Sequence, residues 1–408
     1  KIDFKPKLGH HRSVRQANLF GYYGLGNIGD EAILAGMINS LRKYVDDPHI
    51  SVITNNPEET RALHNVMPVQ HSFNKGIPRF IRSVIFEGEL ATVKREIVNC
   101  DVFILGGGSL LQDLRIYYLP ALLSLIRLAQ RYEKKTVVYG IGAGPIDTPL
   151  GRKLCKSVLN EADLVTVRDA MSKEVLERCG VQEVIRTADP AFGIEVPDPA
   201  VISIYLRSMN ITNGEQYIAT TAYNWLHDSD ISRNAVKEAQ DLLDRRESMA
   251  SIFESIVREH DRKVLFIPTV KVDREGYTAI RDLMPSSGRA EVPEYDPHFN
   301  AVFAALSRSD ILVGMRLHSL ILATMMGVPV VPVSYCGKVK SYLELVGLED
   351  LYLDVEDLGT KAFAERFFEN FDMVWENRTL YAAKQRQAAE QLREKALLNA
   401  KLVAELVN

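Results

Sequence analysis

The segment Asp310-Ile-Leu-Val-Gly-Met-Arg-Leu-His-Ser-Leu-Ile321 decides how this chain is interpreted. A short apolar strand runs to Gly314, and the next helix is predicted to begin beside Arg316 and His318. The first N–H groups of a helix are unpaired and its dipole is positive at that end, so it attracts anions. An always-charged guanidinium and a titratable imidazole placed there suit an anionic substrate that needs a proton.

A second apolar strand, from Val328 to Val333, follows this helix, and Lys338 begins the helix after it. Both strands are predicted to be parallel, with their carboxyl ends at one edge of a sheet. Ligands of open α/β sheets bind at that edge. Lys338 is therefore expected beside Arg316 and His318.

Apolar strands alternate with helix-period segments along the whole chain, which is the pattern of parallel α/β sheets. The 408 residues exceed the size at which one hydrophobic core stops growing, so two domains are predicted. These are residues 1–195 and 215–372, with a Pro/Gly-containing junction between them, and a C-terminal helix in 373–408 is expected to pack back towards the first domain. The predicted strands lie near residues 17–23, 50–54, 102–105, 135–139, 164–167, 184–187, 217–222, 263–267, 311–313 and 328–333.

Composition excludes several classes of protein. The net charge is −4 without a basic stripe, which argues against nucleic acid as a partner. The four cysteines are scattered and no histidines show metal-ligand spacing, so a reducing compartment and the absence of a metal site are expected. The longest charge-free run is broken by Gly327, Pro329 and Pro332, which indicates a buried helix and strand. A cytoplasmic protein with at most peripheral membrane contact is expected, and a homo-oligomer is left open.

The stretch Gly24-Leu-Gly-Asn-Ile-Gly29 matches the dinucleotide-binding pattern G-x-G-x-x-G. A dinucleotide site also needs an acidic residue at the end of the second strand to hold a ribose. That strand ends in Thr54-Asn55-Asn56, with no carboxylate until Glu58. A tight turn before a helix is at least as good an interpretation from the local sequence.

Three further polar positions follow apolar strands. Gln112 and Asp113 come after the glycine run at 106–108, and Arg168 directly follows the strand near 164–167. Turn glycines and an Arg168–Asp169 ion pair are the structural alternatives to ligand binding. A single histidine such as His318 more often has a structural role than a functional one. Arg316, two residues earlier, favours a functional role for His318.

Four stretches, in this order, resemble the polysaccharide pyruvyl transferase family, and they cover most of the chain. The stretches are Gly26-Asn-Ile-Gly-Asp-Glu31, Ile104-Leu-Gly-Gly-Gly-Ser-Leu-Leu-Gln-Asp113, Val165-Thr-Val-Arg-Asp169, and Arg316-Leu-His-Ser319 with the Gly327-Val-Pro329 and Tyr335-Cys-Gly-Lys-Val339 that follow it. The resemblance implies an α/β fold with two Rossmann-like domains facing across a cleft, similar to the GT-B glycosyltransferase architecture.

The resemblance also implies the chemistry. Pyruvate would move from phosphoenolpyruvate onto a sugar of a cell-surface polysaccharide, or its lipid-linked precursor, to form a ketal without a cofactor. His318 would be catalytic. The donor-binding residues would be Arg168, Arg316, Ser319 and Lys338, and the acceptor-binding residues would be Asn27, Asp30, Gln112 and Asp113.

Two alternatives from other classes stay open. A nucleotide-sugar-dependent glycosyltransferase could use the same two-domain scaffold, because fold alone does not fix chemistry. A non-catalytic glycan-binding protein is the second. A basic and apolar segment at residues 73–86 could contact a membrane or a lipid-linked acceptor, although a surface helix with one buried face is the more common meaning of such a pattern.

Overall fold

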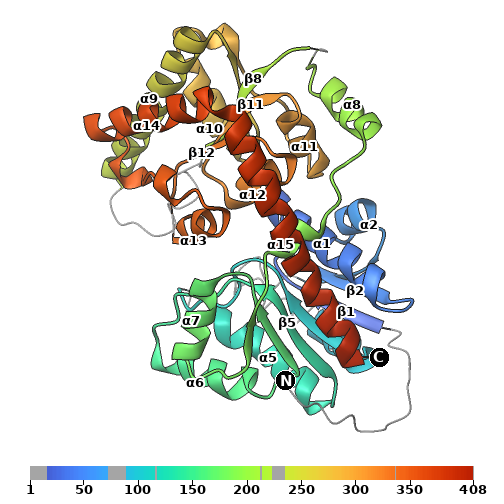
Figure 1. The fold of residues 1–408 in the computed structure, drawn as a ribbon. Coiled ribbons are helices and arrows are strands. Elements are labelled where there is room, and N and C mark those ends of the chain that lie inside the picture. Colours follow the sequence, from blue (N-terminus) through green and yellow to red (C-terminus); the bar gives the residue numbers. More distant parts are fainter. Residues whose placement is uncertain are drawn as a thin grey trace.

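The computed structural model describes residues 16–71, 89–114, 117–211, 214–222, 235–335 and 337–407. These residues form two parallel sheets, one in the lower and one in the upper half of Figure 1, and a long helix lies against both halves. The basic and apolar segment at 73–86 lies outside the described residues.

The first sheet has seven parallel strands in the order β3-β2-β1-β4-β5-β6-β7. The order changes direction between β1 and β4, and open α/β sheets bind ligands outside the strand carboxyl ends at such a point. The strands are β1 (Gln16–Phe20), β2 (His49–Thr54), β3 (Met67–Gln70), β4 (Val102–Gly106), β5 (Lys135–Ile141), β6 (Leu164–Val167) and β7 (Val184–Arg186).

The second sheet has five parallel strands in the order β10-β9-β8-β11-β12. Its direction changes between β8 and β11, so the second sheet has a switch point of its own. The strands are β8 (Tyr217–Thr221), β9 (Lys263–Phe266), β10 (Ala290–Glu291), β11 (Ser309–Gly314) and β12 (Val330–Pro332). The two parallel sheets confirm the predicted α/β class, whereas the short edge strands β3 and β10 had not been predicted.

Helices connect the strands and cover the sheets. In the first half they are α1 (Ile28–Tyr44), α2 (Pro57–His64), α4 (Glu89–Asn99), α5 (Tyr118–Arg131), α6 (Pro149–Leu159) and α7 (Ala170–Arg178). In the second half they are α8 (Pro199–Ser208), α9 (Ala235–His260), α10 (Asp273–Asp282), α11 (Asn300–Leu306), α12 (Leu317–Met326), α13 (Gly337–Val346), α14 (Lys361–Glu376) and α15 (Arg378–Val407). Helix α8 lies inside the predicted junction and packs on α11.

Strand side chains alternate between two cores, because successive residues of a strand point to opposite faces. In β4, Val102 and Ile104 join a core that extends into the second sheet, whereas Phe103 and Leu105 join a core with α4, α5 and α6. Both faces of the strand are buried, which explains why its sequence is a continuous apolar run. The first core continues through α12 and α15, so it joins the two halves of the molecule.

Helix α12 positions the most informative segment of the chain. Its residues are apolar almost all round, and a helix of that kind is buried in the core. It ends at Gly327, whose φ of +67° is the left-handed conformation that glycine adopts most readily at a helix end. The charge-free run is therefore a buried helix, a turn and a buried strand, as the sequence indicated. No helix among the described residues is long and apolar enough to cross a membrane.

Helix α15, red in Figure 1, contacts elements of both halves. Near its start, Gln385 donates a hydrogen bond to the Thr324 hydroxyl of α12 (3.0 Å). Near its end, Asn399 Oδ1 accepts hydrogen bonds from Thr166 Oγ1 (2.6 Å) and Thr187 Oγ1 (2.9 Å) in the first half. Since Gln385 and Asn399 are both fully buried, the helix fixes how the two sheets face each other.

Candidate active site

A cleft of about 1000 Å³ lies where the carboxyl edges of the two sheets face each other. The first sheet contributes the loops after β1, β4 and β6, and the second contributes those after β9, β11 and β12. The cleft therefore lies at the switch points of both sheets, where the topology predicts a ligand. Eight of the nine residues predicted from the sequence line this cleft. They are Arg168, Arg316, Lys338, His318, Ser319, Asn27, Asp30 and Gln112.

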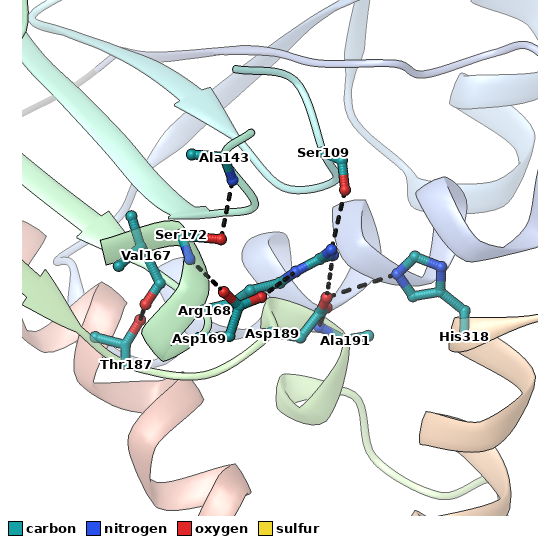
Figure 2. Close-up of polar contacts among 10 residues, drawn as sticks. All are labelled: Ser109, Ala143, Val167, Arg168, Asp169, Ser172, Thr187, Asp189, Ala191 and His318. Atoms are coloured by element: carbon teal, nitrogen blue, oxygen red, sulfur yellow. Dashed lines mark hydrogen bonds and ion pairs between the residues drawn. The ribbon is translucent and has the colours of Figure 1, made fainter. Parts of the chain in front are cut away.

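Arg168 follows β6 directly and is buried at the first-sheet side of the cleft. It donates hydrogen bonds through one terminal nitrogen to Asp189 (3.0 Å), through the other to Ser109 Oγ (3.0 Å), and through Nε to Asp169 (3.3 Å). Burial alone would lower the pKa of Arg168, but the Asp189 and Asp169 carboxylates outweigh it and raise that pKa, so the guanidinium stays charged. Arg168 is thus the partner of a buried acid cluster, as Figure 2 shows. It also lines the cleft.

Asp189, which was not predicted from the sequence to be a site residue, is the residue around which this cluster is organised. Its carboxylate accepts hydrogen bonds from Arg168 and from the Ala191 backbone N–H (3.0 Å), and it lies 3.7 Å from Nε2 of His318. Burial would raise the pKa of Asp189, but His318 and Arg168 lower it to about 2. Asp189 therefore carries a full negative charge between the Arg168 guanidinium and the His318 imidazole.

His318 reaches Asp189 from the second half of the molecule, as Figure 2 shows. It is the second residue of α12, and its imidazole packs on Gly29 in the first turn of α1. A Cβ atom built on Gly29 would lie 2.2 Å from Nδ1 of His318, a distance that real contacts do not reach. The missing side chain at Gly29 is what lets the imidazole lie across the cleft.

Arg316, directly before α12, is held by a second buried carboxylate, which was not predicted from the sequence. One of its terminal nitrogens is hydrogen-bonded to Oδ1 of Asp273, which has no exposed surface. Oδ2 of Asp273 accepts hydrogen bonds from the backbone N–H groups of Thr269 and Val270, both at 3.0 Å. Asp273 thereby fixes Arg316 and the loop after β9 relative to each other.

The same loop joins the two halves directly. The Ile28 backbone N–H at the start of α1 donates to the Thr269 carbonyl (3.0 Å), and Asn27 and Val270 form an isolated antiparallel bridge. Asn27 also caps α1, since its Oδ1 accepts a hydrogen bond from Gly29 N–H (3.0 Å). Part of the polar capacity of Asn27 therefore serves the fold.

Lys338 and Ser319 complete the second-sheet side. Lys338 is the second residue of α13, lines the cleft, and has its Nζ 5.4 Å from the centre of the Tyr335 ring. Ser319 also lines the cleft, but it is buried and its hydroxyl donates to the Arg316 carbonyl (2.6 Å) and lies 2.6 Å from the Thr221 hydroxyl. These contacts give Ser319 a role in shaping the turn that presents Arg316.

The structure separates the two polar residues predicted after the glycine run. Gln112 lines the cleft, whereas Asp113 is not part of its lining. The Asp113 carboxylate accepts hydrogen bonds from the Asp147 and Thr148 backbone N–H groups (3.1 and 2.7 Å) and from the Thr148 hydroxyl (2.7 Å). Burial acts to raise the pKa of Asp113, but these hydrogen bonds outweigh it and lower the pKa. Asp113 therefore holds the loop before α6 in place.

Asp30, in the first turn of α1, differs from these structural acids. It lines the cleft and is 9% exposed, and its carboxylate has no hydrogen bond or ion pair with another described residue. Burial and the neighbouring Glu31 raise the pKa of Asp30 to about 7, while Lys338 and Arg168 act in the opposite direction. This carboxyl group can therefore gain or lose a proton near neutral pH.

A second cavity of about 600 Å³ adjoins the cleft beside α7. Its own lining is largely apolar and includes Pro145, Ile146, Met171 and Val175. The two cavities share six lining residues, of which Leu114 is the apolar one, so a ligand longer than one small molecule could extend from one into the other. The shared residues with polar or charged side chains are Ser109, Gln112, Arg168, Tyr335 and Lys338.

The glycine-rich turn after β1 is closed by the protein itself. Gly24 has a φ of +71°, and a Cβ atom there would lie 2.3 Å from Thr54 Oγ1 and 2.5 Å from the Asn56 backbone nitrogen. Its N–H donates to the Glu31 carboxylate (2.9 Å), so an acid already occupies the place that a pyrophosphate would need. This geometry favours the tight-turn interpretation over a dinucleotide site. Within the described ranges, no three His, Cys, Asp or Glu side chains gather as a group that could hold a metal ion.

The fold is shared with enzymes of the GT-B type. The chain is similar to UDP-GlcNAc 2-epimerase from Neisseria meningitidis, with a TM-score of 0.62 at 11% identity, covering 96% of this chain and 99% of that one. It is also similar to a glycosyltransferase from Rickettsia africae ESF-5, with a TM-score of 0.52 at 12% identity, covering 97% and 96% of the two chains. These likenesses confirm the predicted arrangement of two Rossmann-like domains, with similarity to the GT-B architecture.

Sequence comparison is more specific. The chain is 21% identical over 374 residues to the amylovoran biosynthesis protein AmsJ of Erwinia amylovora, a match that covers 83% of this chain and 88% of AmsJ. The family model for polysaccharide pyruvyl transferases matches residues 27–337, which include all nine predicted site residues except Lys338 immediately beyond its end. The chain therefore belongs to the polysaccharide pyruvyl transferase family.

Proposed function

We propose that the protein transfers pyruvate from phosphoenolpyruvate to two hydroxyls of one sugar, in a polysaccharide or its lipid-linked precursor, and closes a cyclic ketal. The observation that carries the proposal is the convergence of three cations and one imidazole on a single cleft. Arg168 comes from the first sheet, and Arg316, His318 and Lys338 come from the second. Family membership supports the transferase class and a glycan acceptor.

The charges of the cleft suit the proposed donor. Phosphoenolpyruvate carries a phosphate and a carboxylate on one carbon, so its site needs cations on more than one side. The planar guanidinium groups of Arg168 and Arg316 match the oxygens of both anions, and Lys338 adds a point charge. Helices α1, α12 and α13 also begin at or beside the cleft, which directs the positive ends of three dipoles towards it.

His318 suits the proton transfers of the reaction. When a hydroxyl adds to C2 of phosphoenolpyruvate, C3 must gain a proton and the hydroxyl must lose one. An imidazole can exchange protons near neutral pH, and the His318 ring is held 3.7 Å from the Asp189 carboxylate. Because His318 crosses the cleft to reach Asp189, the group that moves the proton lies between the two sheets that hold the substrates.

The first-sheet side of the cleft suits a sugar. The carboxamides of Asn27 and Gln112 offer hydrogen bonds to hydroxyls, and the rings of Tyr22 and Tyr118 offer faces for the apolar side of a pyranose. The adjoining cavity gives a glycan or its aglycone room to continue past Gln112. Acceptors longer than a monosaccharide should therefore be preferred.

A nucleotide-sugar-dependent glycosyltransferase is the second candidate, because the similar structures include UDP-GlcNAc 2-epimerases and a glycosyltransferase. Those likenesses concern the fold, and fold alone does not fix the reaction. The site itself favours the smaller donor, since its three cations line the same cleft as His318 and the glycine turn is occupied by Glu31.

The test presents purified protein with phosphoenolpyruvate and a panel of free and lipid-linked glycans, and follows inorganic phosphate and acceptor mass. The expected result is a gain of one pyruvate ketal with one phosphate released for each acceptor. Release of nucleoside diphosphate from nucleotide sugars, without phosphate from phosphoenolpyruvate, would select the glycosyltransferase. Glycan binding with neither product would select a non-catalytic protein.

A further inference from the structure

We infer that Asp30 is a second proton-transfer residue, which takes the proton of the attacking acceptor hydroxyl while His318 supplies the proton of the new methyl group. The inference rests on the proposed function and deepens it. Asp30 had been assigned only to acceptor binding through the family resemblance. Its geometry in the cleft differs from that of the other buried acids, and this difference is the basis of the new role.

Every other aspartate of the cluster is committed to the fold. Asp189 is bonded to Arg168 and Ala191, Asp273 to Thr269, Val270 and Arg316, and Asp169 to Ser172 N–H and Arg168. Both oxygens of each of these carboxylates already accept structural hydrogen bonds. The Asp30 carboxylate makes no hydrogen bond within the described part of the chain, yet it lines the same cleft as His318. It is therefore available to a ligand hydroxyl.

The position of Asp30 is fixed although its carboxylate is not bonded. It lies in the first turn of α1, one residue after Gly29, on which His318 packs. A Cβ atom on Gly108 would lie 3.3 Å from its Oδ1, so the carboxylate is directed towards the glycine turn after β4. Asp30 and His318 thus come from facing elements that meet at one point of the cleft.

The charges around Asp30 keep its protons exchangeable. Its burial and the adjacent carboxylates favour the neutral acid, while the cations favour the carboxylate, and the balance raises its pKa to about 7. The ideal pKa of a general base or acid lies near the operating pH. The charged groups that act on its pKa are Glu31 on its own helix, Lys338 on α13, and Asp189 and Arg168 after β7 and β6. Tyr23 interacts with it from the loop after β1, and His318 of α12 packs on the adjacent Gly29.

The proposed steps balance. In the first, the His318 imidazolium gives a proton to C3, an acceptor hydroxyl forms a bond to C2, and the hydroxyl proton passes to the Asp30 carboxylate. In the second, another hydroxyl of the same sugar attacks C2, and the bond from C2 to the phosphate oxygen breaks with its electron pair on phosphate. The second hydroxyl proton returns to His318, and phosphate takes the proton held by Asp30. Both side chains end in their starting states.

The experiment compares the wild-type protein with Asp30→Asn, which keeps the shape of the side chain and removes its titration. With phosphoenolpyruvate and an acceptor from the glycan screen, we expect kcat to fall by about 10²–10⁴-fold. Affinity for phosphoenolpyruvate, measured by calorimetry without acceptor, should be kept or improved, because the variant removes a negative charge from an anion site. The limb of the kcat–pH profile near pH 7 should be lost or moved.

A second measurement needs neither donor nor acceptor. Infrared difference spectra of the wild-type protein across neutral pH should show a carboxylic acid band that disappears as pH rises, and Asp30→Asn should lack it. Asp282→Asn, which changes an exposed aspartate on α10, is the matched control and should keep the band and the kinetics. Wild-type kcat and pH profile in Asp30→Asn, or a band that persists in it, would overturn the inference alone. If the wild-type protein transfers pyruvate from phosphoenolpyruvate to none of the acceptors in the panel, the proposed function is wrong. The steps proposed for Asp30 are then wrong as well.

Discussion

His318 Nε2 lies 3.7 Å from Asp189 Oδ2, and through this contact the two sheets share one carboxylate. Asp189 is also bonded to Arg168 at 3.0 Å, so a donor-binding candidate of one half and the catalytic candidate of the other are fixed by the same acid. The packing of the two halves against each other therefore brings these groups of the site together. Substrates that bind between the sheets would meet groups that are already oriented.

Asp189→Asn should reduce stability in a pH-dependent manner. The pKa of Asp189 is about 2 in the folded protein, below the ordinary 3.8, so its ionisation stabilises the fold fully above pH 3.8. That contribution is lost as the pH falls from 3.8 towards 2, and it amounts to about 2 kcal/mol. Urea unfolding should show a gap of at least about 2 kcal/mol between wild type and variant at pH 7, and a smaller gap near pH 3. A gap that is equal at both pH values would contradict this role.

Gly29→Ala should remove activity without weakening α1. Alanine is favoured over glycine in a helix by about 1 kcal/mol, and Gly29 has no unusual backbone angle. Its new methyl group would nonetheless occupy the place of the His318 imidazole and displace it from Asp189. We expect a loss of kcat comparable with that of a His318 variant. Gly288→Ala, at a glycine with no atom near the added carbon, is the control, and equal kinetics in the two variants would exclude the proposed contact.

His318→Gln should bind donor but lose most turnover. Glutamine keeps a hydrogen-bonding side chain and cannot titrate, so the loss should appear in kcat, by about 10²–10⁴-fold, rather than in the affinity for phosphoenolpyruvate. Steady-state kinetics and calorimetry separate the two effects. If the variant keeps the wild-type rate and pH profile, His318 is a structural residue and the mechanism is wrong.

Arg316→Lys should raise the KM for phosphoenolpyruvate by about tenfold or more, because a lysine cannot hold Asp273 and face the ligand with a planar fork. Arg168→Lys should have a similar effect on the donor and should also cost stability, since Arg168 is buried with three hydrogen-bond partners. Arg289→Lys, on an exposed ion pair, is the control for the chemical change. Unchanged KM in either variant would remove that arginine from the donor site.

The fold was predictable where the hydrophobic pattern is strong. Strands buried on both faces, such as β4 and β11, read as continuous apolar runs and were placed within one or two residues. Strand β3 could not be found in this way, because Met-Pro-Val-Gln at residues 67–70 is an exposed edge with a single buried side chain. Strand β10 has only two residues, too few for any periodicity to register.

Site residues that are placed by the sheet topology could be predicted from the sequence. Residues whose role depends on hydrogen-bond partners distant in the sequence could not. Arg168, Arg316 and Lys338 follow strands of parallel sheets, and the rule that ligands bind at the carboxyl edge is enough to bring them together. Asp189 and Asp273 were missed because their importance comes from arginines distant in the sequence, and an aspartate before a proline or at a helix start looks like a cap. The same ambiguity made Asp113 look like a site residue, although it holds the loop before α6.

A structure of the protein determined with phosphoenolpyruvate tests the central claim most directly, because the claim is that both sheets bind one small anion between them. We predict that the phosphate and carboxylate lie within hydrogen-bond distance of Arg168, Arg316 and Lys338, with C3 facing the His318 imidazole. A ligand bound to one sheet alone, or a Lys338 ammonium that points to solvent away from the ligand, would contradict the account.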